Sequence, residues 1–393
     1  MTLCAATLHA QAVTLPDEDT EPPLLLPDDG SLTLRPELQA LGDRLLNGKR
    51  GAIIALDPKT GEVLSLCTNT AEGPDARLAI ATAYEPGSIL KTAQALTMLS
   101  VGAIDENTQV SCYGRFRDGN IRVGCHRHAS PLRLVSALAV SCNTWFISTF
   151  MSFLNDRFFF ADLNEAITTW HDYMTSMSFG GPVGIDLPGE KGGLVANVNY
   201  LNRRYEGSWN ARTILWLGMG QGDITVTPLQ LATYCTSLAN RGYYLTPHIH
   251  KPTIGKPLAN RFLIPHYTMA LPDAYDPVIR GMRQAVVRGT CASINTPQYE
   301  ICGKTGTIEN PAGEDHSAFI CFAPMEDPKI CVAVYVEHGG FGADLAAPMA
   351  SVILEQYLTG HLSQHQKARL ARIEAKRLIP MLPDESDPLP QNQ

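Results

Sequence analysis

Stretches typical of β-strands lie near both ends of this 393-residue chain, and a long region of helical pattern separates them. Two apolar runs, at 51–56 and 63–68, flank a turn-forming segment and indicate a hairpin. Far downstream come three more strand-like runs, at 299–307, 317–323 and 330–338. Because an isolated hairpin is marginally stable, the two groups should share one sheet. The sequence therefore predicts an α/β (α+β) domain whose antiparallel sheet is built from both chain ends and flanked by helices.

The middle of the chain is expected to form an all-helical subdomain at about 92–290. Helices should dominate from 88 to 173, interrupted by a loop rich in Gly, Arg and Cys at 111–128. Another helix is predicted at 227–239, where a proline suits the first helical turn. The apolar helix predicted at 345–358 should pack on the sheet.

Composition argues against two kinds of partner. The net charge is −8 and the chain has no strong basic patch, so we expect no nucleic-acid partner. There is no run of about 18 apolar residues, so we expect no membrane span in this chain. Residues 2–12 end in Ala-Gln-Ala, like a signal-peptidase site, but they are short and lack the basic start of a secretory leader.

One short motif carries the first chemical signal. Ser88 stands three residues before Lys91, directly after a Pro-Gly pair where a loop should end and a helix begin. Positions three apart share a helix face, so the serine hydroxyl and the lysine amine can meet there. A neutral lysine would accept the serine proton and make the serine a nucleophile. Such a motif also occurs by chance in many helices, so its meaning depends on the rest of the chain.

Two further motifs complete the set. A Ser-Cys-Asn run at 141–143 lies between two apolar helical stretches, and Lys-Thr-Gly-Thr at 304–307 belongs to the first of the late strands. The order S-x-x-K, S-x-N and K-T-G is the signature of penicillin-binding proteins and class A β-lactamases. Three motifs in this order, each in its expected element, indicate a serine acyltransferase.

Each residue of the first two motifs has a role that acyl transfer requires. Ser88 would attack a peptide carbonyl, and Lys91 is the nearest base, provided that burial and Lys304 lower its pKa. Ser141 would relay a proton towards the leaving amine, and Asn143 would hold the substrate amide and orient the lysine. The alternative interpretation of Ser141 and Asn143 is an ordinary helix cap.

The strand that carries the third motif should bind substrate. Lys304 would place positive charge near a terminal carboxylate, to which Thr305 and Thr307 would donate hydrogen bonds. Gly306 has no side chain, so substrate could lie against the strand edge. The backbone N–H groups of Ser88 and Thr307 are candidates for an oxyanion hole. Taken alone, the two threonines also suit an ordinary strand face.

From about residue 31 to residue 360 the chain resembles the transpeptidase domain of class B penicillin-binding proteins, most of all the elongation-type group called penicillin-binding protein 2. Besides the three motifs, the resemblance rests on Gly-Ala-Ile-Ile-Ala-Leu-Asp-Pro at 51–58, Tyr-Glu-Pro-Gly-Ser at 84–88, Gly-Ile-Asp-Leu-Pro-Gly-Glu at 184–190 and Gly-Gln-Gly at 220–222. It implies the penicillin-binding-protein/β-lactamase-like fold and D,D-transpeptidation of D-Ala-D-Ala stem peptides of peptidoglycan. It also implies covalent inhibition by β-lactams at Ser88. No cofactor is expected.

The resemblance divides the chain into three parts. These are an extended acidic and Pro-rich lead-in at 1–30, the transpeptidase domain at 31–362, and a basic helix with a disordered tail at 363–393. The membrane anchor and pedestal domain with which such proteins normally begin are not recognisable, so we expect the anchor to be absent from this chain. By resemblance, the protein would act on the periplasmic side of the bacterial inner membrane, with a glycosyltransferase and the elongation machinery as partners.

A second group of reactive side chains lies close together in the sequence: Cys112, Cys125, His126, His128 and Cys142. Such ligands suit Zn²⁺, and some elongation-type relatives carry a zinc near this place. The spacing matches no standard zinc finger, however, and we assign no metal ligand among the site residues. A disulfide between Cys112 and Cys125 across the loop is the alternative.

Other functions share the same motifs. A D,D-carboxypeptidase or a β-lactamase differs in letting water reach the acyl-enzyme, and we find no clear counterpart of the glutamate that activates this water in class A β-lactamases. A non-catalytic sensor or scaffold that binds β-lactams belongs to a different class. The complete set of motif residues argues against such a pseudoenzyme.

Overall fold

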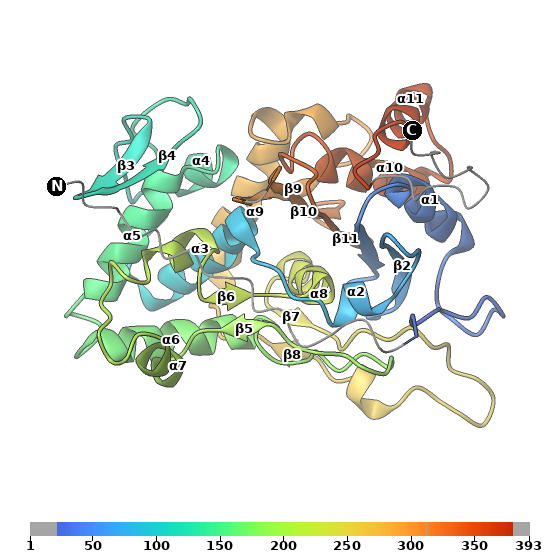
Figure 1. The fold of residues 1–393 in the computed structure, drawn as a ribbon, viewed down its shortest axis with the longest axis horizontal. Coiled ribbons are helices and arrows are strands. Elements are labelled where there is room, and N and C mark those ends of the chain that lie inside the picture. Colours follow the sequence, from blue (N-terminus) through green and yellow to red (C-terminus); the bar gives the residue numbers. More distant parts are fainter. Residues whose placement is uncertain (1–21, 312, 380–393) are drawn as a thin grey trace, which may run out of the picture.

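Five strands contributed by the two ends of the chain form one antiparallel sheet (Figure 1). The computed structural model describes residues 22–311 and 313–379, so the expectations for residues 1–21 and for the tail beyond 379 lie outside it. The strands are β1 (Gly51–Leu56), β2 (Val63–Asn69), β9 (Cys302–Ile308), β10 (His316–Ala323) and β11 (Ile330–Val336). Their order is β2-β1-β11-β10-β9, so β1 and β11 join the two groups. The predicted sheet is confirmed, and β9, which carries the Lys-Thr-Gly motif, lies at its edge.

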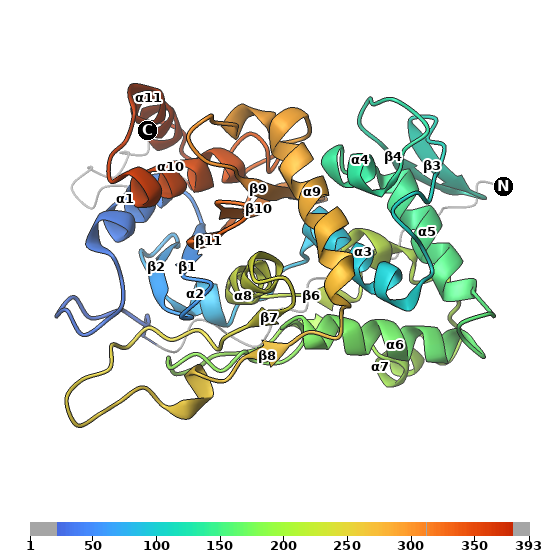
Figure 2. The same ribbon diagram turned by 180° about the vertical axis from the view of Figure 1, so that it is seen from behind.

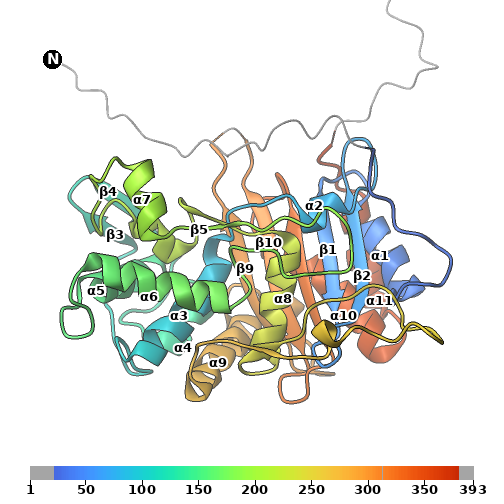
Figure 3. The same cartoon turned by 90° about the horizontal axis from the view of Figure 1, so that it is seen from below.

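Helices cover both faces of this sheet (Figures 2 and 3). On one face packs α8 (Pro228–Ala239), and on the other pack α1 (Pro36–Leu46) and α10 (Ala346–Thr359). Successive strand residues point to opposite faces, so Ile54 joins the apolar cluster of α8 whereas Ile53 joins that of α10. Because both faces are buried, β1, β10 and β11 are largely apolar along their length instead of alternating between apolar and polar residues.

The segment between the two groups of strands is largely helical, as predicted. Its helices are α2 (Arg77–Ile80), α3 (Leu90–Val101), α4 (Leu134–Ala139), α5 (Asn143–Asn155), α6 (Leu163–Ser176), α7 (Val198–Arg204), α8 and α9 (Pro272–Arg288). Short strand pairs lie among them: β3 (Arg115–Asp118) with β4 (Ile121–Gly124), β5 (Leu194–Val195) with β6 (Ile224–Thr225), and β7 (Tyr243–Tyr244) with β8 (His266–Tyr267). Among the described helices, none is long and apolar enough to cross a membrane.

The start of α8 shows how local sequence sets an element boundary. Thr227 lies in extended conformation ahead of the helix, and its hydroxyl accepts a hydrogen bond from the Gln230 N–H at 3.2 Å. In return the Gln230 side chain accepts from the Thr227 N–H at 2.9 Å, and Pro228 occupies the first helical position. This reciprocal pair satisfies two N–H groups that a helix leaves unpaired at its start.

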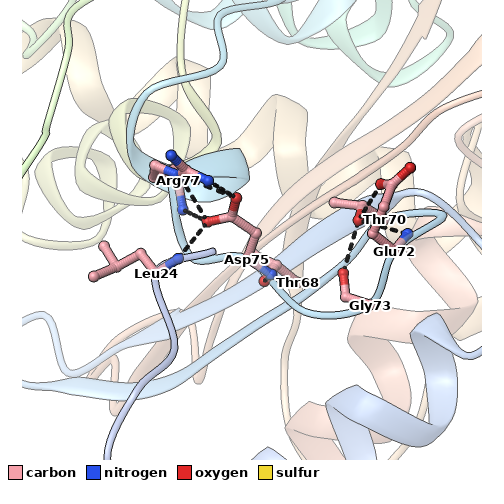
Figure 4. Close-up of polar contacts among 7 residues, drawn as sticks. All are labelled: Leu24, Thr68, Thr70, Glu72, Gly73, Asp75 and Arg77. Carbon is pink, nitrogen blue, oxygen red and sulfur yellow. Dashed lines mark hydrogen bonds and ion pairs between the residues drawn. The ribbon is translucent and has the colours of Figure 1, made fainter. Parts of the chain in front are cut away.

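The segment that leads into the domain is held against the turn after β2 (Figure 4). The Leu24 N–H donates to the Asp75 carboxylate at 3.1 Å, and the Leu24 carbonyl accepts from the Ala76 N–H at 3.0 Å. Asp75 is fixed in turn by an ion pair of 2.7 Å with Arg77. Beside it, the Thr70 hydroxyl closes the preceding turn by donating to the carbonyl of residue 73 at 2.9 Å.

Two expectations about the chain need correction. The insert at 111–128 was expected to be a loop, and the middle region all-helical, but residues 115–124 form the β3–β4 hairpin. Its Phe116 and Val123 pack in an apolar cluster with Ile147 of α5, and this burial stabilises strands that have little apolar sequence of their own. The basic helix expected within 363–393 is α11 (Gln364–Glu374).

Candidate active site

Ser88 lies in a tight turn at the base of a cleft of about 690 Å³. It belongs to a 3-10 turn, Gly87–Ile89, that runs directly into α3, as the Pro-Gly signal indicated. Gly87 has φ +53°, and a Cβ there would lie 3.0 Å from the Thr307 carbonyl. Gly220 packs still closer, since a Cβ on it would lie 2.1 Å from the Gly87 carbonyl. These two glycines allow the Ser88 turn to press between β9 and the segment at 220.

Lys91 is fully buried one turn after Ser88. Its Nζ donates to Asn143 Oδ1 at 2.5 Å, to the Ser141 carbonyl at 3.0 Å and to Ser141 Oγ at 3.2 Å. Burial lowers the pKa of Lys91 to about 8, which brings the neutral amine within reach near physiological pH. The hydrogen bond between Lys91 and Ser88 that the spacing allows is not formed. Within the described residues, the half-buried Ser88 hydroxyl makes no hydrogen bond.

Ser141 is the point where the two motif lysines meet. Its hydroxyl accepts from Lys304 Nζ at 2.9 Å as well as from Lys91 Nζ. Lys304 is also fully buried, and burial together with the nearby Lys91 holds its pKa well below the ordinary lysine value. Ser141 has the left-handed φ of +53°, a costly conformation that aims its side chain at the lysines.

The helix-cap interpretation of Ser141 and Asn143 is wrong. The residue that caps α5 is Cys142, whose Sγ accepts from the Trp145 N–H at 3.4 Å. Asn143 instead uses its amide group to join two parts of the site. Its Oδ1 accepts from Lys91, and its Nδ2 donates to the Gly124 carbonyl of β4 at 2.7 Å.

The other wall of the cleft is β9, which presents Thr305 and Thr307 on the same side as Ser88. The Thr307 hydroxyl accepts from the Gly342 N–H at 3.3 Å. Gly306 is buried, and a Cβ there would lie 3.1 Å from both Ile89 Cγ1 and the carbonyl of residue 86. The missing side chain at Gly306 therefore makes room for the Ser88 turn. In the sequence analysis, glycine was instead expected here so that substrate could lie against the strand edge.

Several residues that the sequence analysis did not single out also line this cleft: Gly124, Arg127, Arg288, Thr290, Phe341 and Asp344. Thr290 is the most directly connected, because its hydroxyl accepts from the Thr305 hydroxyl at 3.0 Å. It follows Gly289, which ends α9, and so has the sequence context of an ordinary helix end. Its position beside β9 arises from tertiary packing, for which the local sequence holds no signal.

The fold brings most of the predicted cysteine and histidine group together, and two of the expectations about this group need correction. Cys112, Cys125, His128 and Cys142 offer ligand atoms that all lie within 4.8 Å of one another. The alternative of a Cys112–Cys125 disulfide is wrong, since both cysteines are free thiols. His126 lies outside the cluster, against the ring of Phe341 in the cleft.

The donor set of this cluster fits Zn²⁺. Three thiols and one imidazole form a Cys₃His set of the kind used in structural zinc sites. His128 Nδ1 lies 2.7 Å from the Ala129 carbonyl, which fixes the proton on Nδ1. His128 Nε2 is buried and has no hydrogen-bond partner, as expected of a nitrogen that binds a metal. A hydrogen bond from Cys142 lowers the pKa of Cys125 and so favours its thiolate, the form that binds zinc.

Comparison with known proteins assigns the chain to a family. The family model described as "Penicillin binding protein transpeptidase domain" matches residues 51–355. The chain belongs to this family. Within it, the transpeptidase domain is of the penicillin-binding protein 2, or MrdA, type. The predicted family and fold class are both confirmed.

The relatives of this transpeptidase domain are longer proteins. Peptidoglycan D,D-transpeptidase MrdA of Acinetobacter baumannii is 30% identical over 380 residues, covering 82% of this chain and 53% of the relative. The Haemophilus influenzae MrdA is 28% identical, covering 86% and 57%. The chain thus spans little more than half the length of these relatives. Among solved structures, Pseudomonas aeruginosa PBP2 in complex with WCK 5153 matches with TM-score 0.73 and 29% identity, covering 85% of this chain and 76% of that one.

Proposed function

We propose that this chain catalyses D,D-transpeptidation of peptidoglycan through an acyl-enzyme on Ser88. The observation that carries the proposal is the convergence of two buried lysine amines on one hydroxyl, with Lys304 Nζ at 2.9 Å and Lys91 Nζ at 3.2 Å from Ser141 Oγ. Two ammonium groups this close disfavour each other's charge, so at least one lysine is kept neutral and basic. The family membership and the MrdA relatives support the same activity.

In the first half of the reaction, the Ser88 hydroxyl attacks the carbonyl of the penultimate D-Ala. Its proton passes to neutral Lys91, an Oγ–C bond forms, and the negative charge on the carbonyl oxygen is held by the N–H groups of Ser88 and Thr307. The C–N bond then breaks, and the leaving amine of the terminal D-Ala takes a proton by way of Ser141. Lys304, with the hydroxyls of Thr305 and Thr307, would hold the terminal carboxylate. A β-lactam would follow the same path to Ser88 and stay attached.

In the second half, the amine of a neighbouring stem peptide attacks the Ser88 ester. A C–N bond forms, the Oγ–C bond breaks, and a proton from the amine returns to the Ser88 oxygen. Water in place of the amine would give a D,D-carboxypeptidase, or a β-lactamase when the acyl group comes from penicillin. The acidic residues that line the cleft are Glu309, Asp315 and Asp344, and none of them belongs to the segment that supplies the water-activating glutamate of class A β-lactamases.

One experiment separates these functions. The protein is incubated with a pentapeptide ending in D-Ala-D-Ala and an acceptor amine, and the products are identified by mass spectrometry. Cross-linked product together with free D-Ala supports transpeptidation, whereas shortened peptide alone indicates a carboxypeptidase. A fluorescent penicillin is tested in parallel. Labelling that is lost within minutes would indicate a β-lactamase. Stable labelling without peptide products would indicate a sensor. The absence of any labelling would refute the proposal that this protein is an enzyme.

The cysteine and histidine cluster supports a second proposal, a structural zinc site. The ion would be held by Cys112, Cys125, His128 and Cys142. It would join distant segments of the chain and would take no part in the reaction. The ion would tie the insert that carries β3 and β4 to the start of α5, directly beside Asn143. The site would therefore keep one wall of the cleft in position.

Location and partners are proposed from the relatives. Because relatives of this chain are peptidoglycan D,D-transpeptidases, we propose that the protein acts at the periplasmic side of the bacterial inner membrane. A solved peptidoglycan synthase complex that coordinates polymerization and crosslinking matches this chain with TM-score 0.71 and 25% identity, covering 85% of this chain and 63% of that one. A glycosyltransferase and other elongation proteins are the corresponding partners proposed here. The proposed organisation is a transpeptidase domain over 31–362, preceded by the lead-in and followed by the basic helix.

A further inference from the structure

The β3–β4 hairpin presents a row of arginines to solvent. Arg117 on β3 stands directly opposite Arg122 on β4, and Arg115 lies two positions along the same face of the hairpin. All three side chains are exposed. The opposite face carries Phe116 and Val123, which are packed in the apolar cluster on α5. The hairpin is therefore divided into one face that holds it to the domain and one face that is free and cationic.

This arginine row lacks acidic partners. Within the described part of the chain, Arg115, Arg117 and Arg122 form no ion pair, and the one acid of the hairpin, Asp118, is already paired with Arg212 at 2.7 Å. Like charges directly opposite each other disfavour a strand pair. The chain as a whole has a net charge of −8, so this row is opposite in sign to the molecule that carries it. An uncompensated row of this kind suits an anionic ligand.

A groove of about 460 Å³ lies beside Arg115 and Arg117 of the row and has the chemistry to bind a peptide. Its lining combines two arginines, two aromatic rings and three hydroxyls: Arg115, Arg117, Tyr113, Phe116, Ser111, Thr144 and Ser148. The Tyr113 side chain is 88% exposed, so its ring is open to a partner. Guanidinium groups pair with carboxylates through two parallel hydrogen bonds, and hydroxyls and rings suit the remainder of a peptide.

The hairpin leads directly into the catalytic cleft. The last residue of β4, Gly124, accepts the 2.7 Å hydrogen bond from Asn143, and Gly124 and Arg127 line the same cleft as Ser88. Thr144 of the groove directly follows Asn143, and its hydroxyl lies 3.2 Å from Cys125 Sγ. The groove and the cleft are thus lined by adjoining residues at the start of α5, with Asn143 in the cleft and Thr144 in the groove. A peptide that occupied the groove would lie next to residues that line the cleft.

We propose that the arginine row and its groove bind the acceptor peptide, an anionic stem whose amine attacks the acyl group on Ser88. This inference rests on the proposed transpeptidation and adds to it a site for the second substrate. The recognised chemistry is carboxylate, which a stem peptide carries at its free C-terminus. A lipid surface is also anionic, but it would contact the exposed arginines without using the hydroxyls and aromatic rings that line the groove. A peptide is therefore the ligand that the position favours.

The test measures binding separately from turnover. The full chain is first acylated with penicillin, and the anisotropy of a fluorescent peptide with a free amine and a C-terminal carboxylate is followed. The variant Arg115→Gln/Arg117→Gln should raise the Kd for this peptide about fivefold, a loss consistent with two exposed charge pairs. The control Arg203→Gln removes an exposed arginine of α7 and should leave the Kd unchanged. The same peptide with a C-terminal carboxamide should bind both variants and the parent equally.

Three other results would overturn the assignment of the row to acceptor binding. An unchanged Kd for the carboxylate peptide in the double variant would remove the row from acceptor binding. An equal loss for the carboxamide peptide would mean that the arginines support the fold and do not recognise charge. Anionic phospholipid vesicles that bind the parent but not the double variant, without peptide binding, would assign the row to a lipid surface. Charge-dependent peptide binding without any cross-linked product would keep the site and refute the proposed transpeptidation instead.

Discussion

The two walls of the cleft are built in different ways. The β9 wall is part of a regular sheet, and its position follows from pairing with β10 and from apolar packing around the strands. The opposite wall is the connection from α4 to α5, where Ser141 adopts a left-handed φ of +53°. That wall is held by polar side-chain contacts from Lys91 and Asn143 and by the cluster around Cys125.

Because the two walls are held in different ways, different changes should disturb them. On β9, the direction of Thr305 and Thr307 follows from strand periodicity, so packing and register control it. On the α4–α5 wall, the direction of Ser141 depends on buried groups that titrate or bind metal. We therefore expect the position of β9 to be insensitive to chelators, and the α4–α5 wall to respond to both pH and chelators.

The largest effect is expected where the walls meet, at Ser88. The change Ser88→Ala removes the proposed nucleophile, so labelling by a fluorescent penicillin should fall about 10⁴-fold or more. Thermal stability should stay close to that of the parent, since the hydroxyl makes no hydrogen bond within the described residues. Intact-mass measurement after incubation with penicillin checks the first statement and a melting curve the second. An adduct that persists at full rate in this variant would place the nucleophile elsewhere.

A change at Lys304 should couple the two walls, because this lysine belongs to β9 but donates to Ser141. We expect Lys304→Ala to slow acylation about 100-fold, the scale of losing one charged group beside a reacting centre. The matched control is Lys49→Ala. Lys49 is likewise fully buried, with its pKa lowered to about 8, but it donates to the Asn47 carbonyl away from the cleft. Equal acylation rates in the two variants would show that burial of a lysine, not its place in the cleft, is what matters.

The two walls also differ in how far the sequence predicted them. The strands around β9 were predicted nearly in full, because apolar runs and the Lys-Thr-Gly motif are local signals. The role of Gly306 was not, because its contact with Ile89 joins residues far apart in the chain. On the other wall, the motif located Ser141 and Asn143, but neither the backbone conformation of Ser141 nor the cap by Cys142 has a signal in residue type.

The insert beside that wall was the least predictable part. Its strands pair because Phe116 and Val123 find an apolar surface on α5, which no pattern within the insert announces. The choice of His128 over His126 in the cysteine cluster likewise depends on the path of the loop. Sequence alone placed the right residue types near one another, and tertiary packing decided which of them meet.

The pH dependence of acylation should depend on the α4–α5 wall, which Lys91 contacts. The pKa of Lys91 is lowered from 10.5 to about 8, and the neutral amine acts as base, so the acylation rate should rise with pH and level off above about 8. Below that value it should fall about tenfold for each pH unit. Because of the same shift, Lys91 loses its proton at a lower pH in the folded state than in the unfolded state. The free energy of unfolding should therefore rise with pH between about 8 and 10.5. A stopped-flow profile of penicillin acylation that is flat between pH 6 and 9 would exclude Lys91 as the base.

The smallest effect on catalysis is expected from zinc removal. Removing zinc should disturb the α4–α5 wall and leave β9 unchanged, so it distinguishes the two walls most clearly. Purified protein should contain about one zinc ion per chain by elemental analysis, as a Cys₃His site binds one ion. A strong chelator should lower the melting temperature by several degrees and slow acylation only a few-fold, because Asn143 and Ser141 lose support beside Cys142 while β9 keeps its position. The variant Cys112→Ala should lack zinc and show no further change with chelator, whereas Cys291→Ala, a buried cysteine outside the cluster, should respond like the parent. A melting temperature that chelator leaves unchanged in the parent would mean that side-chain packing alone holds the α4–α5 wall.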